Sequence, residues 1–256
     1  MSFFIDTHAH TYLPEFDNDR EEVIRNSVHN KVQKILMPNI DSSSVDIMNQ
    51  VARQFPGICY PMMGLHPTSV KGNYKEELAV IEQELKKPQY IAVGETGIDL
   101  YWDKTWIKEQ EEAFRTQIEL SLLHDLPLVI HARESFPEIL NILTDYTRRG
   151  VRGVFHAFTG DSETAEKIID MGFYFGIGGI ITYRKSDLPV TVSNIPIERI
   201  LLETDSPYLP PVPYRGKRNE SSYIPVIAQH IQNIKNLPLD EVAEVTTKNA
   251  LELFRM

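Results

Sequence analysis

Several features that define other protein classes are scarce or missing in this chain of 256 residues. It has one cysteine, which excludes a framework of disulfide bonds. The N-terminus lacks a basic region followed by an apolar stretch of about 7–15 residues, and no apolar run approaches the ~18 residues that cross a bilayer. We therefore expect an intracellular, cytoplasmic protein without a membrane role.

Positive charge is also scarce. Lys and Arg total 26 against 36 Asp and Glu, so the formal net charge is −10. Broad, unspecific binding of nucleic acid needs a basic face, and this charge argues against it. A small basic patch, or bound metal ions that locally reverse the sign, remains compatible with an anionic substrate.

Short apolar runs alternate with longer amphipathic stretches. In these stretches apolar residues recur at three- and four-residue spacing, as Val23, Ile24 and Val28 do, which predicts helices. No linker rich in Gly and Ser and no abrupt change in composition divides the chain, so one domain is favoured over two. The runs predict eight strands, at residues 3–8, 34–39, 58–64, 90–95, 127–132, 153–158, 173–179 and 200–205.

Eight strands that alternate with helices in this length fit a (β/α)8 barrel. We predict an α/β fold in which residues 1–256 form a single TIM-barrel domain. The proline-rich segment 207–213 comes too late to leave a second domain behind it, and is predicted to be a loop over the barrel mouth. Glycines in the seventh run, such as Gly176, are expected to allow close packing or the approach of a substrate.

Histidines and acids gather where these strands are predicted to end. In a parallel barrel the carboxyl ends of the strands share one face, and catalytic residues come from that face. One histidine in such a place often only bonds a loop, but a group of them predicts a functional site. The group consists of His8, His10, His66, Glu95, His131, His156 and Asp205.

These residue types are suited to metal ions. Neutral imidazole suits Zn, Mn, Fe or Ni, whereas carboxylate oxygen suits harder ions and can bridge two of them. His8 and His10 are two residues apart on one predicted strand, so both side chains point to the same face. About four histidines with two carboxylates supply enough ligands for two metal ions, with positions left open for water.

A series of motifs follows in order along the chain: DTHAH, GLHP, GETGID, IHAR, FHAFTG and LETDSPYL, then YRGKRNE. They resemble the TatD family of metal-dependent deoxyribonucleases, within the amidohydrolase superfamily, from Phe3 to the terminal NALELF. One departure is Ser221, which stands where we expect proline and replaces no ligand. The resemblance implies two divalent ions, Mg, Mn or Zn, whose ligands are His8, His10, Glu95, His131, His156 and Asp205.

The resemblance also suggests roles for single residues. The resemblance implies that Glu95 bridges the two ions. Many members of the superfamily that hydrolyse lactones, amides or phosphotriesters use a modified lysine for this purpose. The alternative role for Glu95 is a salt bridge in the barrel rim. His66 matches a histidine of the family that lies near the metals and the substrate, which implies that it contacts a phosphate or transfers a proton. Alternatively, His66 only caps the turn at Pro67. Asp205 is well placed to hold a metal and to take a proton from the attacking water.

Basic residues near these positions could hold a phosphate. Arg133 follows His131 by two residues, and its guanidinium could bind a phosphate oxygen or form a rim ion pair instead. A basic loop could supply cations for phosphates and rings for base stacking, or could simply be solvated. It contains or adjoins Arg215, Lys217, Arg218, Tyr208 and Tyr214.

We expect hydrolysis of a phosphodiester in DNA or RNA by a water that two metal ions activate. The few basic residues imply a short footprint, which favours an exonuclease that acts on single-stranded ends, of the TatD deoxyribonuclease type. A hydrolase of a small ester, lactone or amide would use the same metals, and a barrel that merely binds nucleic acid or protein is the third possibility. No obligate protein partner is evident.

Overall fold

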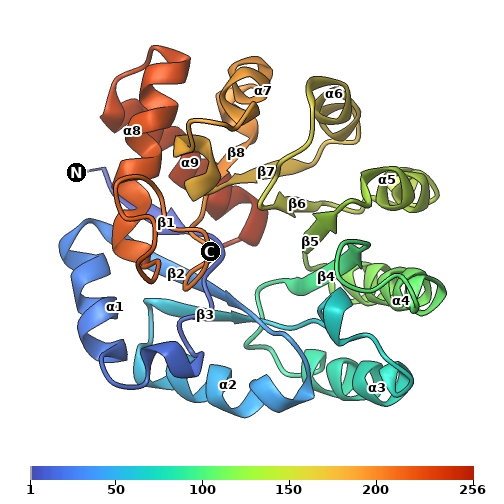
Figure 1. The fold of residues 1–256 in the computed structure, drawn as a ribbon. Coiled ribbons are helices and arrows are strands. Elements are labelled where there is room, and N and C mark those ends of the chain that lie inside the picture. The colour runs from blue at the N-terminus through green and yellow to red at the C-terminus, as the bar shows by residue number, and fades with distance from the viewer. Residues whose placement is uncertain (1) are drawn as a thin grey trace.

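Strands and helices alternate along the chain and form a TIM barrel, with the strands inside and the helices around them (Figure 1). The computed structural model describes residues 2–256. The strands are β1 (Phe4–Asp6), β2 (Val32–Pro38), β3 (Cys59–Met62), β4 (Val93–Asp99), β5 (Leu128–Arg133), β6 (Gly153–His156), β7 (Tyr174–Ile177) and β8 (Ile200–Leu202).

The helices follow the strands in sequence and cover the outside of the barrel (Figure 1). None of the helices within residues 2–256 has the length and apolar character needed to cross a membrane. They are α1 (Arg20–His29), α2 (Val45–Gln54), α3 (Tyr74–Leu85), α4 (Ile107–His124), α5 (Phe136–Thr144), α6 (Ser162–Asp170), α7 (Leu188–Asn194), α8 (Ile224–Lys235) and α9 (Leu239–Phe254).

All strand pairs are parallel and lie in two groups, β1 to β3 and β4 to β8. Isolated bridges join the groups, one between Met63 and Val93 and one between Ala9 and Ser206. The eight predicted strands are therefore confirmed, and their carboxyl ends share one face.

The end of β4 differs from the prediction. The sequence TGID after Glu95 was expected to leave the strand, but β4 continues to Asp99 and pairs with β5. Gly97 has a φ of 139°, and a Cβ at this position would lie 2.1 Å from the carbonyl oxygen of His131. Glycine at position 97 is thus needed for the close approach of the two strands.

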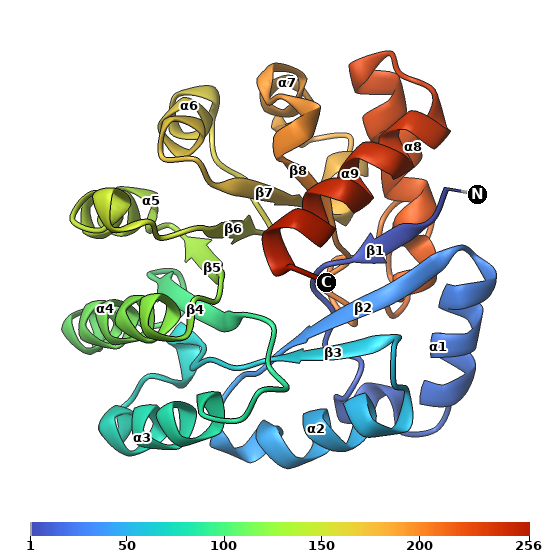
Figure 2. The same ribbon diagram turned by 180° about the vertical axis from the view of Figure 1, so that it is seen from behind.

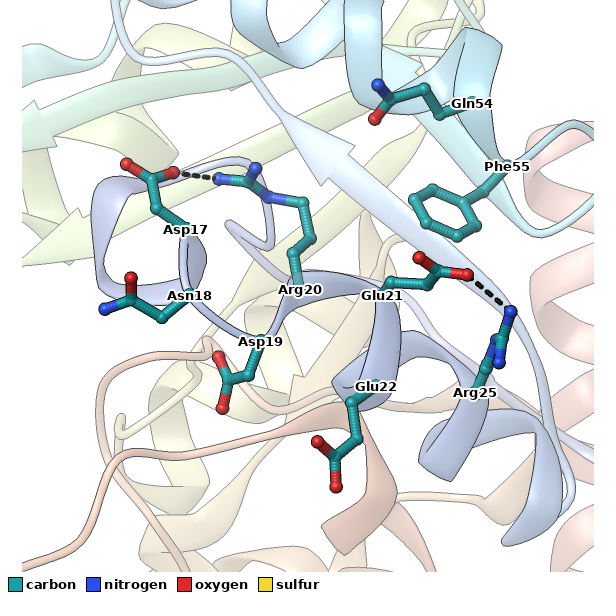
Figure 3. A pocket seen from close by; sticks show the side chains of 9 residues that line it. All are labelled: Asp17, Asn18, Asp19, Arg20, Glu21, Glu22, Arg25, Gln54 and Phe55. Atoms are coloured by element: carbon teal, nitrogen blue, oxygen red, sulfur yellow. Dashed lines mark hydrogen bonds and ion pairs between the residues drawn. The ribbon is translucent and has the colours of Figure 1, made fainter.

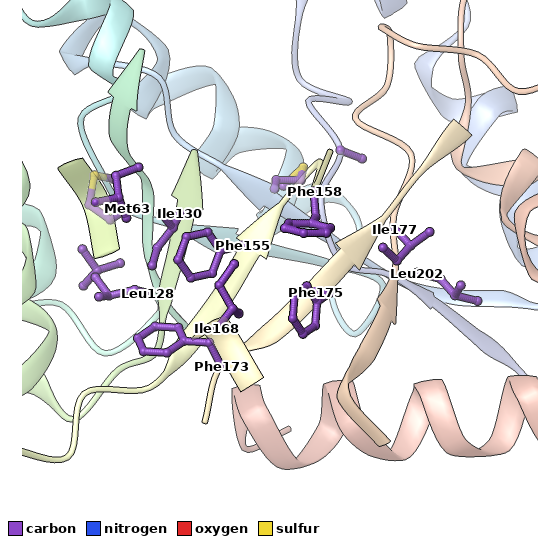
Figure 4. Close-up of a cluster of buried hydrophobic side chains, with 14 of the residues drawn as sticks. Met63, Leu128, Ile130, Phe155, Phe158, Ile168, Phe173, Phe175, Ile177 and Leu202 are labelled. Carbon is purple, nitrogen blue, oxygen red and sulfur yellow. The ribbon is translucent and has the colours of Figure 1, made fainter. Parts of the chain in front are cut away.

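Alternation along the strands sends apolar side chains to two different clusters. Leu128 and Ile130 belong to the larger cluster between the strands and the surrounding helices, whereas Val129 belongs to a smaller one. Within the larger cluster, aromatic rings of β6, β7 and adjoining residues pack edge to face (Figure 4). Phe155 and Phe173 have ring centroids 5.7 Å apart, and Phe158 and Phe175 are 4.9 Å apart.

Helix α9 crosses one end of the barrel (Figure 2). Leu253 and Phe254 of α9 pack against strand residues such as Ile5, Val129 and Leu201 in the smaller cluster. Thr247 and Asn249 of α9 also donate hydrogen bonds to the carbonyl oxygens of Phe3 and Ile200, at the starts of β1 and β8, so α9 covers the amino-terminal end of the barrel. The polar residues at the carboxyl ends are therefore left at the other end.

Candidate metal centre

The seven histidines and acids predicted at strand ends converge on one face of the barrel. Six of them line a cavity of about 710 Å³. The cavity wall contains His10, His66, Glu95, His131, His156 and Asp205, together with Asp99, Trp102, Arg133 and Tyr208. His8 lies behind them, fully buried.

Glu95 lies at the centre of this group with 2% of its surface exposed. Its Oε2 is 3.0 Å from His8 Nε2 and 3.7 Å from His10 Nε2. Its Oε1 is 2.9 Å from His131 Nδ1 and 3.2 Å from His66 Nε2. Each carboxylate oxygen therefore faces a different set of imidazoles, as a bridge between two cations requires.

Asp205 approaches the same histidines from the segment that follows β8. Its Oδ1 is 3.6 Å from His10 Nε2, 3.8 Å from His156 Nε2 and 3.9 Å from His8 Nε2. The imidazoles of His8 and His156 stack with their centroids 3.4 Å apart. Ligands from the end of β6 and from the segments after β1 and β8 thus lie together.

The donor atoms fit metal ions in both number and type. Three sets of side chains could each hold a metal ion. Within each set the ligand atoms lie within 4.8 Å of one another, and each set combines imidazole with carboxylate. His66 belongs to one of these sets, although the sequence placed it beside the metals and not among their ligands. The sets are His8 with His10 and Glu95, His8 with His156 and Asp205, and His66 with Glu95 and His131.

The protonation states also suit a cation. Burial would raise the pKa of Glu95, but His66, His8 and His156 hold it well below its usual value. Burial and the neighbouring His156 lower the pKa of His8 to about 4. At neutral pH Glu95 is thus ionised and His8 neutral, the forms in which both bind metal. Burial lowers the pKa of His156, but Glu203 and Glu95 raise it to about 10 overall, so a metal ion would displace a proton there.

The structure shows that His66 caps the turn at Pro67, and phosphate contact or proton transfer by this residue stays a prediction. Its Nδ1 accepts a hydrogen bond of 3.1 Å from the backbone N–H of Thr68, so it caps the short helical turn Pro67–Ser69. Its Nε2 points the other way, towards Glu95. Capping therefore orients the imidazole and leaves Nε2 facing the site.

Two further carboxylates hold the predicted ligands in place, and sequence reasoning missed both. Asp99 Oδ2 is 2.9 Å from His131 Nε2. Glu203 Oε1 is 3.0 Å from His156 Nδ1. Carboxylates behind histidine ligands fix ring orientation and raise basicity. The period of two in LETD, which places Glu203 on the same face as Asp205, was the available signal.

Gly176 of β7 provides the room that Glu203 needs. A Cβ on this residue would lie 2.0 Å from Glu203 Oε2. Glu203 also accepts a hydrogen bond of 2.6 Å from the backbone N–H of Ala157, the residue after His156. The expectation that a glycine in the seventh strand permits close packing is confirmed.

Asp6 ends β1 but faces no metal-ligand set. Its carboxylate accepts hydrogen bonds from the N–H of Thr204 at 3.0 Å and from the hydroxyl of Thr204 at 2.6 Å. It also accepts a longer one from the N–H of His8. Asp6 therefore ties β1 to the segment that carries Asp205, and burial raises its pKa to about 7.

Arg133 lies on the cavity wall without an ion pair among the residues of the described chain. Its guanidinium stacks over the ring of Tyr101 at 3.9 Å and lies 5.3 Å from the ring of Trp102. The alternative of a rim ion pair is therefore wrong, and the arginine remains available to an anion.

The basic loop is used in part for folding. Arg218 pairs with Asp19 at 2.6 Å and with Glu220 at 3.1 Å, so a phosphate would have to replace these bonds. Tyr214 stacks on Tyr223 at 4.0 Å, which occupies a ring expected to stack on a base. We therefore correct the prediction for Arg218 and Tyr214.

Three of the residues predicted to contact phosphates or bases are accessible to a substrate. Arg215 is exposed and lies over the ring of Tyr183 at 4.2 Å, and Lys217 is exposed. Tyr208 is 49% exposed and lines the cavity. Arg215 and Lys217 are therefore the cations of this loop that could contact a phosphate.

A second surface hollow, of about 1030 Å³, lies between the start of α1 and the end of α2 (Figure 3). Both of its arginines pair with acids of the same hollow, Arg20 with Asp17 and Arg25 with Glu21. Among the described residues that line it there is no histidine. Within residues 2–256 the sets of convergent ligands all lie at the strand ends, so the cavity there is the candidate site.

Similar proteins match over the whole length of the chain. Residues 5–255 match the family model described as TatD related DNase. A Bacillus subtilis (strain 168) relative, named uncharacterized metal-dependent hydrolase YabD, is 37% identical over 252 residues, which cover 98% of each chain. The crystal structure of YjjV, a TatD homolog from Escherichia coli K12, has a TM-score of 0.93 at 28% identity and covers 99% of this chain and 98% of its own.

Proposed function

Because the chain belongs to the TatD family, we propose that this metal-dependent hydrolase cleaves phosphodiester bonds in nucleic acid, as a deoxyribonuclease that acts on single-stranded ends and can also accept RNA. One observation carries the proposal. The two oxygens of Glu95 face separate histidine sets at the base of an open cavity, with Arg133 unpaired on its wall. A phosphodiester is an anion that such a site can hold.

The ligand set divides between two positions. His8, His10 and Asp205 would hold one divalent ion and His131 the other, with Glu95 shared. His156 Nε2 faces both positions, because it lies 3.8 Å from Asp205 Oδ1 and 3.7 Å from Glu95 Oε1. When bound, the ions would lower the pKa of water and neutralise charge on the phosphate oxygens.

Asp205 is the candidate base in this scheme. Burial would raise its pKa, but hydrogen bonding from His10 and the charges of His156 and His8 lower it, so the carboxylate is ionised at neutral pH. It lines the cavity and can accept a proton from water held there. We propose that His66, which lines the cavity beside Glu95, contacts a phosphate oxygen or moves a proton through Nε2.

Charge distinguishes a phosphodiester from an uncharged ester, lactone or amide. Arg133, Arg215 and Lys217 lie around the cavity or in the adjacent loop, and the described chain provides no ion pair for them. An uncharged substrate would need none of these cations. The alternative of a carbonyl hydrolase is therefore less well supported.

Cleavage of end-labelled oligonucleotides tests the proposal. Single- and double-stranded DNA and RNA would be incubated with Mg, Mn or Zn in turn, beside ester, lactone and amide substrates. We expect metal-dependent shortening of single-stranded DNA from one end. Turnover of the carbonyl substrates with no cleavage of any nucleic acid would contradict the proposal.

A further inference from the structure

The loop between β4 and α4 presents two aromatic rings beside the cavity. Tyr101 is 51% exposed and Trp102 is 68% exposed, which is unusual for rings of this size. Their centroids are 5.0 Å apart with an interplanar angle of 87°. We call Tyr101, Trp102 and the adjoining Arg133 the aromatic shelf.

Arg133 makes the aromatic shelf cationic. Its guanidinium covers Tyr101 at 3.9 Å, so the Tyr101 ring is engaged while much of Trp102 stays open to solvent. Trp102 and Arg133 line the same cavity as the predicted metal ligands. A flat apolar surface thus lies next to a positive charge at the mouth of the site.

Asp99 connects the aromatic shelf to the metal centre. Its Oδ1 accepts hydrogen bonds from the backbone N–H groups of Tyr101 at 3.0 Å and of Trp102 at 3.2 Å. Its other oxygen, Oδ2, lies 2.9 Å from His131 Nε2. One buried carboxylate therefore sets the position of the loop relative to a ligand histidine.

We infer that Trp102 stacks against one unpaired nucleobase next to the scissile phosphate, while Arg133 contacts an adjoining phosphate. This inference rests on the proposed function, and it adds that the base of a single-stranded substrate is bound by Trp102. A base has an apolar face for the indole and an anionic backbone for the guanidinium, and stacking of this kind tolerates any base. In a duplex both faces of a base are already covered, so duplex DNA should use the aromatic shelf poorly.

Fluorescence can detect the stacking without measuring catalysis. The chain has two tryptophans, so Trp106→Phe leaves Trp102 as the single indole. The probe is a thymidine hexamer with phosphorothioate linkages, which resist hydrolysis, added to the metal-loaded protein. We expect quenching by this strand, and much weaker quenching by an abasic hexamer of equal charge and by a duplex.

Kinetics give a second, independent readout. A cleavable single strand is compared with one that lacks the base beside the scissile bond. Loss of this stacking should raise KM by roughly five-fold to 100-fold. We expect that penalty for the abasic strand with the parent enzyme, and no such difference between the two strands with Trp102→Ala. Trp102→Phe, which keeps a ring, should retain most of the discrimination.

Leu123→Ala is the matched control. Leu123 is 74% exposed near the far end of α4, away from the cavity, so its removal should leave KM for both strands unchanged. A Trp102→Ala enzyme that keeps the full abasic penalty, or equal quenching by the base-bearing and abasic hexamers, would overturn the inference. Failure of the parent to cleave any nucleic acid would instead contradict the proposed function, and the quenching comparison would still decide whether Trp102 stacks on a base.

Discussion

Carboxylates at different depths surround the histidines, and their contacts assign them different tasks. Asp6 ties β1 to the segment after β8 through Thr204, whereas Asp99 and Glu203 lie behind imidazoles and orient them. Glu95 and Asp205 face the cavity itself. The residue type is almost the same throughout, so position alone separates the acids that support the fold from those predicted to hold metal.

The base role of Asp205 predicts a specific kinetic change. Asp205→Asn should lower kcat by at least about 10²-fold with a smaller change in KM, because the amide cannot accept the proton from water. Metal content must be measured on the same sample, since Asp205 is also a predicted ligand. A variant that is fully loaded with metal and turns over within a few-fold of the parent would remove Asp205 from this role.

Asp6 predicts a pH dependence of folding stability. Its pKa is raised to about 7 in the folded chain from 3.8, so the folded state binds the proton more tightly and stability is lost as the pH rises through this interval. Asp6→Asn removes this titration. In chelated protein, the free energy of unfolding of the variant relative to the parent should increase by about 1.4 kcal/mol per pH unit from about pH 5 to pH 6, and by about half as much near pH 7. A difference that stays flat with pH, measured by urea unfolding, would contradict the account.

At the scale of elements, the strand ends place the site, and most of them are readable from the sequence. Apolar runs locate all eight strands, and the histidines at their ends do converge. The end of β4 is not readable, because its continuation past Glu95 depends on pairing with β5, a distant segment that Gly97 allows to approach closely. Asp99 and Trp102 follow that misplaced end, which is why both were missed.

Contacts between distant elements explain the other corrections. Arg218 pairs with Asp19, and these residues are far apart in the sequence. Tyr214 stacks on Tyr223 across the loop that leads to α8. Composition and spacing show that a loop is basic and aromatic, but not that its side chains are already engaged by the fold.

The accessible part of that loop, Arg215 and Lys217, should anchor a polyanionic substrate. Replacing both residues with Ala should raise KM for an oligonucleotide and flatten its salt dependence, since each phosphate contact on a single strand contributes a log–log slope of about −0.7. A small chromogenic phosphodiester should be affected much less because it has no neighbouring phosphates.

Two results would count against this role of the loop. Equal losses on both substrates would place Arg215 and Lys217 in the metal site or the fold. Unchanged KM for the oligonucleotide would show that the loop is only solvated. The single variant Lys185→Ala, which removes another exposed lysine, serves as the charge control.

At the scale of the whole molecule, the two ends of the barrel have opposite characters. Helix α9 and apolar strand residues fill the amino-terminal end, and buried imidazoles and carboxylates occupy the other. The chain as a whole carries a formal charge of −10, which would repel a nucleic acid. Cations at the ligand sets would reverse that sign locally, so the account depends on metal at this site.

Metal content and turnover, measured together on the parent and on Glu95→Gln, test this dependence most directly. Amide replacement keeps the volume of the side chain but removes the charge that two ions would share. The account predicts that the metal-loaded parent holds two divalent ions per chain and cleaves single-stranded DNA, and that the folded variant loses metal and activity together. Full activity of the chelated parent, or normal metal content and turnover in Glu95→Gln, would contradict it.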